Sequence, residues 1–435
     1  MKWPAASLVA LALAQACLLP GESQAPTERV VYGKANSKST DLAVGAGDRF
    51  SGGQSTPVGL GMSDRDLQSI LNVGEVDSGL HALARAFKAV TIFPAPHRTF
   101  EDRIVYGLVI GRPRVFLLGG IHGRERGVPD SLVYFLSDLL TARAWGAGLS
   151  YGGQNYTNVQ VNAALSAGIV AVPLANPDGA AHDHATRSCW RKNRNARVSE
   201  GRGHPTATGV DLNRNFAVMW DYKRIFHEAA DLRFAASDQA ASEVFHGTAP
   251  LSEPESQNVD WVFERQGGLS WFLDLHSNKG DIFYAWGDDD YQVDDAGQNF
   301  ANRTYDGKRG FLAQEGERVP YREYIDPRDL VAQQSVVSAM RTAMERAGSV
   351  RYMASPHSSR YVTSGTSAEH AFGRDKAGSC AAKRVHGLTM EFGRHSESPF
   401  CPFYPDKDAY HENLRQVAVG LMELLLAVAA EDGGA

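Results

Sequence analysis

Arg114-Val-Phe-Leu-Leu-Gly-Gly-Ile121 is an almost uninterrupted apolar run that leads directly into His122-Gly-Arg-Glu125. A short apolar run bounded by turn residues is typical of a strand that is buried on both faces. The run therefore predicts a core strand, with an imidazole and a carboxylate placed where the strand passes into a loop. Two such side chains three positions apart can bind one Zn²⁺ ion. The pair is a weak signal alone, so the remaining parts of a metal site must come from elsewhere in the chain.

Strand-like and helix-like segments alternate along the chain on both sides of this run. We predict strands at 104–110, 115–121, 168–174, 269–276 and 385–392, and helices at 131–140, 253–265, 331–347 and 410–430. This alternation is the pattern of a layered α/β fold. We expect a single large α/β domain over residues 66–430, with a mixed, mostly parallel twisted sheet and helices on both faces.

The composition fits a chain with a sizeable core and excludes some functions. Of the 435 residues, 43% are hydrophobic and 22% are charged, which is ordinary for a globular protein. A net charge of -6 is mild for this length and gives no support to nucleic-acid binding. We expect a monomer that has no nucleic-acid partner.

The N-terminus has the features of a signal peptide. Lys2 precedes an apolar stretch at 7–19, and small residues that suit cleavage lie at 14–16 and 23–25. We expect residues 1–25 to be a signal peptide and residues 26–65, rich in Gly, Ser and Thr, to be a flexible leader. The mature protein would be secreted or periplasmic, with a lipoprotein anchor at Cys17 as the alternative. The apolar run at 417–430 is interrupted by Glu423 and predicts a core-facing helix, so we expect no membrane span.

The sequence does not decide how the cysteines pair or what two polar segments do. In an oxidising compartment Cys380 and Cys401, which flank one predicted strand, could pair and leave Cys189 free, but the sequence does not decide the connectivity. Residues 222–242 and the acidic residues of 288–295 look like surface insertions. We expect the acidic run to be a solvated loop. A calcium site is the alternative, although the spacing is not that of an EF-hand.

Two further strand ends supply the missing parts of a metal centre. His276 follows the apolar strand at 269–276 and offers a third ligand. Two histidines, one glutamate and an open position for water make the catalytic type of zinc site. Glu391 ends the last predicted strand, where a carboxylate is costly to bury without a purpose. It can act as a base toward a water that the metal activates, although an ion pair with Arg394 is the alternative.

Gly209-Val-Asp-Leu-Asn-Arg-Asn-Phe216 is the most specific segment. Arg214 offers a planar fork that binds a carboxylate through two hydrogen bonds, and Asn213 adds an amide donor. Asp211 is a candidate partner for the free ring N–H of a metal-bound histidine. The segment therefore predicts a carboxylate-binding site beside the metal.

Taken in order, these segments resemble the zinc metallocarboxypeptidase family of the carboxypeptidase A/B type, over about residues 66–430. The motifs that carry the resemblance are His122-x-x-Glu125, Asn176-Pro-Asp-Gly179, Trp190-Arg191-Lys192, Asp211-Leu-Asn-Arg-Asn215, His276-Ser277, Tyr361 before Ser364-Gly365, and Glu391. The resemblance implies hydrolysis of the C-terminal peptide bond of peptides or proteins.

The resemblance also implies a role for each matching residue. One Zn²⁺ per chain would be held by His122, Glu125 and His276. Glu391 would serve as general base and acid, and Arg191 would stabilise the oxyanion. The residues implied to bind the substrate are Arg124 along the cleft and Asn213, Arg214 and Tyr361 at its terminal carboxylate.

The substrate preference implied by the resemblance depends on Ala368, which matches the base of the family's side-chain pocket. A small neutral residue there favours apolar or aromatic C-terminal residues, whereas Glu369 or Asp288 could shift the preference to Lys or Arg. The stretch between His276 and Glu391 is longer than we expect for the family, so the loops around the cleft are predicted to be enlarged. The leader is too short for the large folded propeptide of digestive members, and we do not expect activation by its removal.

Three other functions are conceivable for this sequence. Gly148-Leu-Ser-Tyr-Gly152 matches the Gly-x-Ser-x-Gly motif of serine hydrolases, but it lies among Gly, Asn and Gln rather than between a strand and a helix. An inactive binding module on the same fold would typically lack a ligand or the base, and all of them are present. Within the enzymes, an exported peptidase that acts on cell-wall peptides is the alternative.

Overall fold

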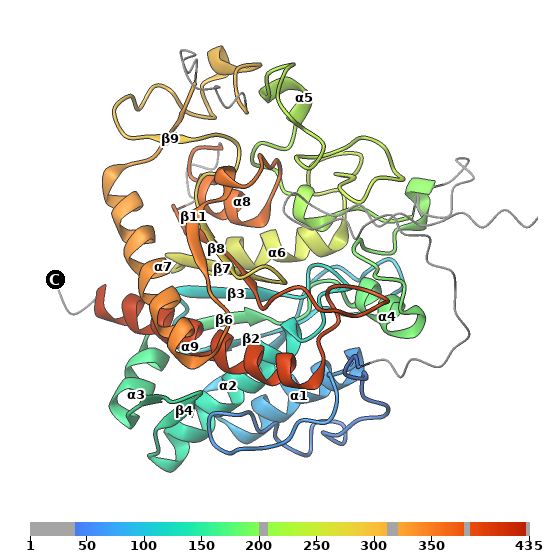
Figure 1. Cartoon of the computed structure of the whole chain (residues 1–435), viewed down its shortest axis with the longest axis vertical. Helices are drawn as coiled ribbons and strands as arrows, with labels where there is room; N and C mark the ends of the chain where they lie inside the picture. Colours follow the sequence, from blue (N-terminus) through green and yellow to red (C-terminus); the bar gives the residue numbers. More distant parts are fainter. Residues whose placement is uncertain (1–39, 200–207, 311–320, 378–382, 432–435) are drawn as a thin grey trace, which may run out of the picture.

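A mixed eight-stranded sheet forms the centre of the computed structural model, which describes residues 40–199, 208–310, 321–377 and 383–431 (Figure 1). The predicted signal peptide, Cys17 and Cys380 lie outside the described residues. The strand order is β1-β2-β6-β3-β7-β12-β8-β11. Its strands are β1 (Val90–Pro94), β2 (Tyr106–Ile110), β3 (Val115–Gly119), β6 (Ile169–Val172), β7 (Trp271–Ser277), β8 (Asp281–Tyr284), β11 (Met353–Pro356) and β12 (His386–Phe392).

Parallel pairs run through the middle of this sheet. β6 with β3, β3 with β7 and β7 with β12 are parallel, as are β8 and β11 at one edge. The pairs β1 with β2, β2 with β6 and β12 with β8 are antiparallel. Four of the seven pairings are thus parallel, which confirms the predicted mixed sheet.

The apolar run before His122 forms the buried strand β3. All five of its residues are buried, and they alternate between two apolar clusters. Val115 and Leu117 belong to one cluster, and Phe116 and Leu118 to the other, because side chains on a strand alternate between faces. The prediction of a core strand is confirmed.

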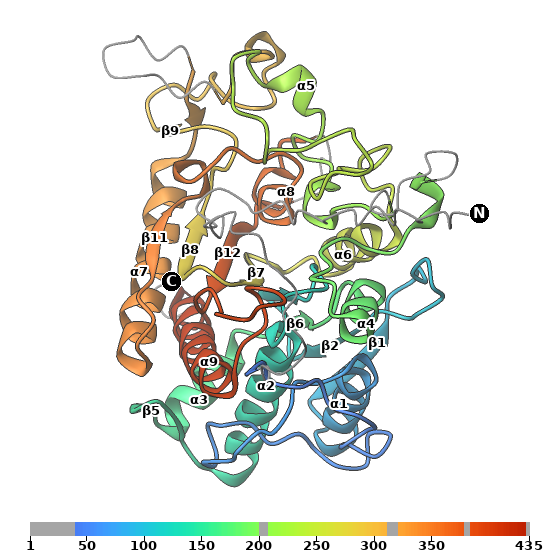
Figure 2. The ribbon, with the colours of Figure 1, turned by 45° about the vertical axis from the view of Figure 1, so that its right-hand side comes forward.

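Helices cover both faces of the sheet (Figures 1 and 2). One cluster packs the sheet against α1 (Val73–Ala86), α2 (Val128–Trp145), α3 (Asn158–Ser166), α7 (Pro327–Ala347) and α9 (Lys407–Ala430). The other packs it against α6 (Pro254–Arg265) and α8 (Ser367–Gly373). The two clusters make the layered α/β domain that the sequence predicts. A further helix, α4 (Pro177–Thr186), follows β6.

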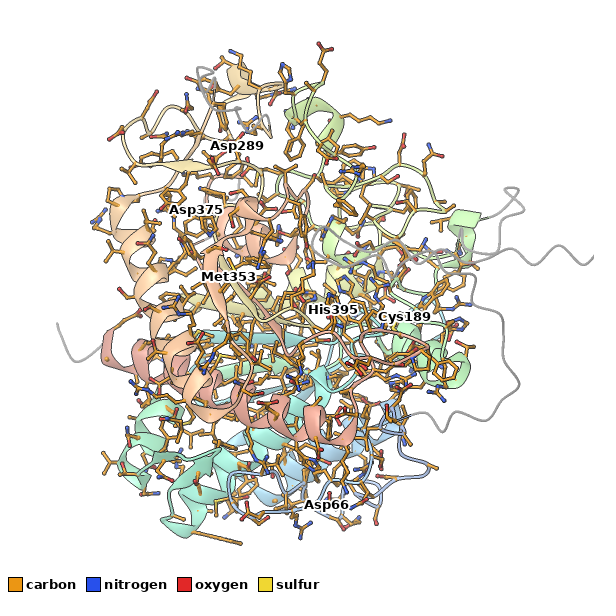
Figure 3. All side chains as sticks on the ribbon, viewed as in Figure 1. Asp66, Cys189, Asp289, Met353, Asp375 and His395 are labelled. Carbon is orange, nitrogen blue, oxygen red and sulfur yellow. A yellow bond between two sulfur atoms is a disulfide. The ribbon has the colours of Figure 1, made fainter. Side chains whose placement is uncertain are left out.

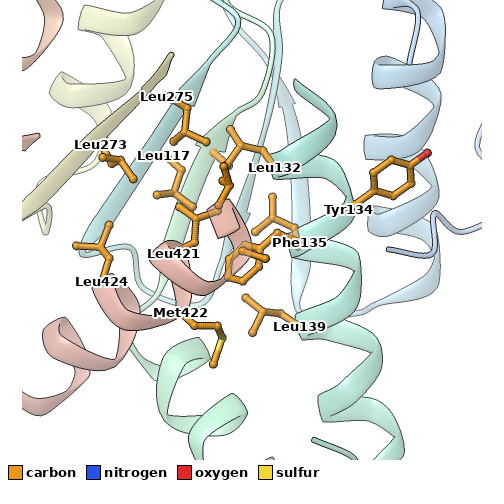
Figure 4. Close-up of a cluster of buried hydrophobic side chains, with 14 of the residues drawn as sticks. Leu117, Leu132, Tyr134, Phe135, Leu139, Leu273, Leu275, Leu421, Met422 and Leu424 are labelled. Atoms are coloured by element: carbon orange, nitrogen blue, oxygen red, sulfur yellow. The ribbon is translucent and has the colours of Figure 1, made fainter. Parts of the chain in front are cut away.

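The packing of α9 explains its long apolar sequence. By length and composition it could cross a membrane, but most of it is buried inside the protein. Leu421 and Leu424 face Leu117 and Leu273 of the sheet, and Met422 lies near Leu139 of α2 (Figure 4). The prediction of a core-facing helix is therefore confirmed.

Residues 40–65, which the sequence analysis assigns to a flexible leader, lie against the domain. Phe50 and Leu60 are buried in the main apolar cluster, and the Arg49 guanidinium pairs with Glu75 at 2.6 Å. The segment 222–242, for which the sequence predicts a surface insertion, contains the short helix α5 (Tyr222–Ile225) and is partly buried. Its apolar side chains, Phe226 and Ala235 among them, form a separate small core with Trp286.

The structure departs from the sequence analysis at the cysteines, where it excludes one possible pairing, and at the acidic run, where the prediction is wrong. The disulfide joins Cys189 to Cys401, so Cys189 is not free and Cys401 does not pair with Cys380. The acidic run is not simply a solvated loop, because Asp288 and Asp289 are fully buried while Asp290 is exposed. Asp289 lies in the upper part of Figure 3, and its carboxylate accepts hydrogen bonds from backbone N–H groups, which offset the cost of burial.

Candidate active site

His122, Glu125 and His276 meet at one edge of the sheet. The first two lie in the loop between β3 and α2, and His276 is the last but one residue of β7. Because β3 and β7 are parallel neighbours, their carboxyl ends reach the same edge. Gly120 allows the chain to leave β3 here, since its φ is +61° and a Cβ would lie 2.8 Å from Leu174.

The ligand atoms of these three buried residues lie within 4.8 Å of one another. Glu125 joins the two rings, with Oε1 at 2.7 Å from Nδ1 of His122 and Oε2 at 3.0 Å from Nδ1 of His276. Two imidazole nitrogens and a carboxylate are a donor set that suits Zn²⁺. Among the described residues this is the only group of three or more such side chains that could hold a metal. The calcium alternative for residues 288–295 therefore has no support.

Each histidine has a second carboxylate behind it. Nε2 of His122 lies 3.1 Å from Oδ1 of Asp211, and Nε2 of His276 lies 2.9 Å from Oδ2 of Asp274. Burial opposes protonation of His276, but Asp274 and Glu125 outweigh it and raise the pKa of the imidazole well above its usual value. Such outer partners fix the orientation of metal-binding rings. Asp211 was predicted for this place from the sequence, whereas Asp274 was not.

Arg191 lies close to the proposed metal ligands, because it binds Asp211 and Asp211 contacts His122. Its Nε and Nη2 both donate to Oδ2 of Asp211 at 3.0 Å. Burial works against the charge of Asp211, but Arg191 and His122 still hold the pKa of this carboxyl far below its usual range. The arrangement keeps a guanidinium at the metal site and leaves its Nη1 for another oxygen.

Glu391 stands opposite His276, since the two are paired residues of β12 and β7. Burial raises the pKa of Glu391 to about 8, with Glu125 adding to the shift and His276 opposing it. Arg394 is exposed, and no ion pair between these two described residues is formed. The geometry therefore favours the predicted base over the structural ion pair.

Arg214 is a buried cation without a carboxylate partner. It lies with Asn213 in the short 3-10 helix η3 (Leu212–Arg214). Its guanidinium donates only to backbone carbonyls, to Asn213 at 2.6 Å and to Phe234 at 3.0 Å. No Asp or Glu of the described residues pairs with it. Burial lowers the pKa of Arg214, as expected for a cation held away from water and from anions.

Asn213 and Tyr361 lie next to this guanidinium and the ligand group. Nδ2 of Asn213 is 3.2 Å from Nε2 of His276. The ring of Tyr361 is half-buried, and its centroid lies 6.2 Å from that of the Phe234 ring and 5.2 Å from that of the His357 ring. The backbone carbonyl of Phe234 accepts a hydrogen bond from Arg214. The structure thus brings the predicted carboxylate-binding residues together beside the metal ligands.

Arg124 and Ala368 occupy less expected environments. Arg124 is almost fully buried, pairs with Glu243 at 3.3 Å and lies over the ring of Phe403 at 4.4 Å. Two of its nitrogens, Nε and Nη2, have no hydrogen-bond partner among the described residues. Ala368 is half-buried on α8 against the apolar cluster of that face. The sequence contained no signal for Glu243, which belongs to an irregular segment.

Ser150 does not occupy the turn that a serine nucleophile needs. It lies exposed on β4 (Leu149–Tyr151), which forms a hairpin with β5 (Gln154–Tyr156). The nucleophile elbow of serine hydrolases is instead a turn from a strand into a helix. The described residues therefore give no structural support to the hypothesis of a serine hydrolase.

Comparison with known proteins points in one direction. The family model described as zinc carboxypeptidase matches residues 77–408. Carboxypeptidase B of Astacus astacus is 27% identical over 228 residues, which are 51% of this chain and 66% of that protein. Zinc carboxypeptidase A 1 of Anopheles gambiae is 31% identical over 196 residues, 44% of this chain and 38% of that protein. The matched part of the chain thus spans less than two thirds of the length of these relatives.

Solved structures share the fold. Bovine thrombin-activatable fibrinolysis inhibitor, in complex with tick carboxypeptidase inhibitor, has a TM-score of 0.59 at 18% identity, covering 83% of this chain and 98% of that one. Carboxypeptidase A from Helicoverpa armigera has a TM-score of 0.59 at 22% identity, covering 83% of this chain and 74% of that one. At this level of identity the likeness concerns the fold.

Proposed function

Because the chain belongs to the zinc carboxypeptidase family, we propose that it hydrolyses the C-terminal peptide bond of peptides or proteins. The observation that carries this proposal is the buried guanidinium of Arg214, which has no carboxylate partner among the described residues and lies next to Asn213. A guanidinium of this kind is suited to the terminal carboxylate of a peptide. The carboxylate would fix the substrate so that its last peptide bond lies at the ligand group.

The proposed chemistry divides among the residues of the site. Zn²⁺, held by His122, Glu125 and His276, would polarise the scissile carbonyl and lower the pKa of water. Glu391 would take a proton from the attacking water and pass it to the departing amine. Arg191, with Nη1 not used by Asp211, would stabilise the negative charge that develops on the carbonyl oxygen.

We propose a preference for apolar or aromatic C-terminal residues. Ala368 packs with apolar side chains and offers no charge. The two nearby acids are poor partners for Lys or Arg at neutral pH. Glu369 accepts from Gly287 N and Thr366 Oγ1, and burial, with Asp288, raises its pKa to about 8. Asp288 is itself buried, with the Arg309 guanidinium at 3.6 Å.

Hydrolysis of matched peptides tests the activity and the preference together. Peptides that differ only in a C-terminal Phe, Lys or Glu are incubated with the zinc-loaded protein, and release of the last residue is measured. We expect Phe to be released fastest and a C-terminally amidated Phe peptide to be resistant, because it lacks the carboxylate. Cleavage of the amidated peptide at an equal rate would refute the carboxypeptidase proposal, and faster release of Lys would refute the preference.

The proposed role of Glu391 has its own test. In Glu391→Gln the amide cannot accept the proton from water, and we expect kcat to fall by about 10²- to 10⁴-fold with zinc still bound. Glu397→Gln, at an exposed position of the same segment, is the control. Normal turnover by Glu391→Gln would overturn the mechanism.

No contact among the described site residues favours cell-wall peptides over other peptides.

We also propose that the mature protein is secreted or periplasmic. Beside the N-terminal sequence, the support is the Cys189–Cys401 disulfide, since disulfides persist in oxidising compartments. Expression of the full chain followed by cell fractionation tests this proposal. Protein found only in the cytosol with both thiols free would contradict it.

A further inference from the structure

Asp274 contacts a metal ligand but has no part in the function proposed above. It stands two residues before His276 on β7, so the two side chains share one face of the strand. Asp274 is fully buried, and its Oδ2 lies 2.9 Å from Nε2 of His276. Its Oδ1 has no hydrogen-bond partner among the described residues, and no Lys or Arg of that part of the chain pairs with it. A buried carboxylate of this kind is costly unless a neighbour offsets its charge.

The ligand group decides which ring nitrogen of His276 carries hydrogen. Nδ1 of His276 and Nδ1 of His122 both face the carboxylate of Glu125, at 3.0 Å and 2.7 Å. A nitrogen that binds a cation presents its lone pair, so a neutral metal-binding ring carries its hydrogen on the other nitrogen. Nε2 of His276 therefore needs an acceptor.

In the part of the chain that the structure describes, Nε2 of His276 has two polar neighbours, and only one of them can accept a hydrogen bond. Oδ2 of Asp274 is an acceptor at 2.9 Å, and Nδ2 of Asn213 lies at 3.2 Å. The backbone N–H of Ser367 donates to Oδ1 of Asn213 at 2.9 Å, which orients the amide so that its NH₂ end faces the imidazole. An NH₂ group only donates. The hydrogen bond therefore runs from Nε2 to Asp274, and both N–H groups of Asn213 stay available.

We infer that Asp274 is a positioning residue that sets the tautomer and orientation of His276. It directs the lone pair of Nδ1 toward the metal and, by accepting from Nε2, leaves the amide of Asn213 for the substrate carboxylate. Only this last step rests on the proposed function, because the metal is held whether or not a peptide is cleaved. Metal binding and carboxylate recognition would thus be linked through one imidazole ring.

Ser367 connects this arrangement to α8. Its hydroxyl donates to Oδ2 of Asp274 at 2.5 Å, while its backbone N–H holds Asn213. Both polar neighbours of His276 are thus oriented by the first residue of the helix that carries Ala368. The partner of His122 is held differently, because Asp211 binds the Arg191 guanidinium. The charge of Asp274 is instead balanced at His276 and at the metal it would hold.

Zinc affinity tests the inference without reference to peptidase activity. Asp274→Asn keeps the shape of the side chain and removes its charge. Asp130→Asn is a matched control, since Asp130 is also fully buried and takes two hydrogen bonds on one oxygen while the other has none. Its donors are Leu71 and Tyr410 rather than a metal ligand. The dissociation constant of Zn²⁺ is measured on the metal-free full chain by competition with a chromophoric chelator, and folding is checked by circular dichroism.

We expect Asp274→Asn to bind zinc about 10- to 100-fold more weakly, as for other partners of metal-binding histidines, and Asp130→Asn to match the wild type. In Asp274→Asn saturated with zinc, KM for a peptide with a free carboxylate should rise more than kcat falls, because Asn213 is no longer kept free. Should Asp274→Asn not fold, Ser367→Ala removes only the supporting hydroxyl and should weaken zinc binding by a smaller factor.

Three results would overturn the inference. They are unchanged zinc affinity in folded Asp274→Asn, an equal loss in Asp130→Asn, and, where only Ser367→Ala folds, wild-type affinity in that variant. A wild-type protein that binds zinc but cleaves no peptide would refute the proposed function and leave this test intact. The two failures are therefore distinguishable.

Discussion

At the scale of single residues, the site works by placing charges where water cannot screen them. Among the described residues only backbone carbonyls accept hydrogen bonds from Arg214, so an incoming carboxylate meets a cation that is not already paired with an anion. Arg191 is different, because Asp211 already takes two of its nitrogens. The first guanidinium is therefore suited to binding and the second to a charge that develops during the reaction.

Replacing Arg214 tests the carboxylate site. Arg214→Lys keeps a charge but loses the planar fork, and we expect KM to rise by about 10- to 100-fold, which matches the loss of a charge-assisted hydrogen bond of about 1.5–3 kcal/mol. Steady-state kinetics with a C-terminal Phe peptide measure this. Arg233→Lys, at an exposed residue paired with Asp231, should leave KM unchanged. An unchanged KM in Arg214→Lys would remove this residue from the binding site.

The acid beside Ala368 predicts a pH-dependent preference. Glu369, whose pKa burial raises to about 8, is neutral below that pH and becomes an anion above it. We therefore expect the ratio of Arg to Phe release to rise as the pH increases from 7 to 9. The ratio is measured with paired peptides at each pH. In Glu369→Gln it should stay flat, and a flat ratio in the wild type would show that Glu369 does not face the substrate.

At the scale of elements, the carboxyl ends of β3, β7 and β12 bring the proposed metal ligands and the proposed base to one edge of the sheet. The loops that follow are then held by contacts outside the sheet. The disulfide joins Cys189, two residues before Arg191, to Cys401, which follows β12. Tyr404 reinforces this junction, since its hydroxyl donates to Asp183 at 2.6 Å and accepts from the N–H of Cys189 at 3.0 Å.

Removing the disulfide should destabilise the protein and disturb Arg191. The two cysteines are 212 positions apart, and loop-closure entropy for such a separation corresponds to an upper value of about 5 kcal/mol. We expect Cys189→Ser with Cys401→Ser to lower the melting temperature and kcat, as measured by calorimetry and peptide hydrolysis. Cys380→Ser should change neither. A double variant as stable and active as the wild type would contradict the proposed junction.

At the scale of the whole molecule, the metal links parts of the chain that are far apart in sequence. His122 and Glu125 precede His276 by about 150 positions, yet one carboxylate joins both rings. Without a cation, the two imidazoles and the carboxylate of Glu125 are buried together, with Asp211 and Asp274 as their nearest further charged neighbours. Metal binding should therefore stabilise the native state as well as enable the reaction.

Metal removal tests that link. At a free zinc concentration about 1,000 times the dissociation constant, binding adds about 4 kcal/mol to the stability of the folded state. We expect dialysis against a chelator to lower the melting temperature by several degrees and added zinc to restore it, as followed by calorimetry. In His122→Ala the melting temperature should not respond to zinc at these concentrations. A wild-type melting temperature that is independent of zinc would argue against metal binding at this group.

The sequence by itself determined the local features of this protein. Buried strands such as β3, and the group of His and Glu side chains that could hold a metal at their ends, were predictable because apolar runs and His-x-x-Glu spacing act over a few residues. The strands β1, β8 and β11 were not predicted, because they are short and their apolar patterns are mixed. Helix α1 was not predicted either, although its buried residues Val76, Leu80 and Leu83 recur at helical spacing. Asp274 was not predicted as a partner of His276, although residues two apart on a strand share one face, because only the tertiary structure shows which group a buried aspartate contacts.

Tertiary structure alone decided which distant groups meet. Cys401 pairs with Cys189 rather than Cys380, the acids at 288 and 289 are buried, and Arg124 pairs with Glu243. Each of these outcomes depends on how segments separated by tens to hundreds of residues pack. Burial then sets the energy of the charged groups, because removing water makes an ion depend on the few partners that the fold brings to it. The candidate metal ligands could therefore be predicted from the sequence, whereas the residues that surround them could be identified only in the folded structure.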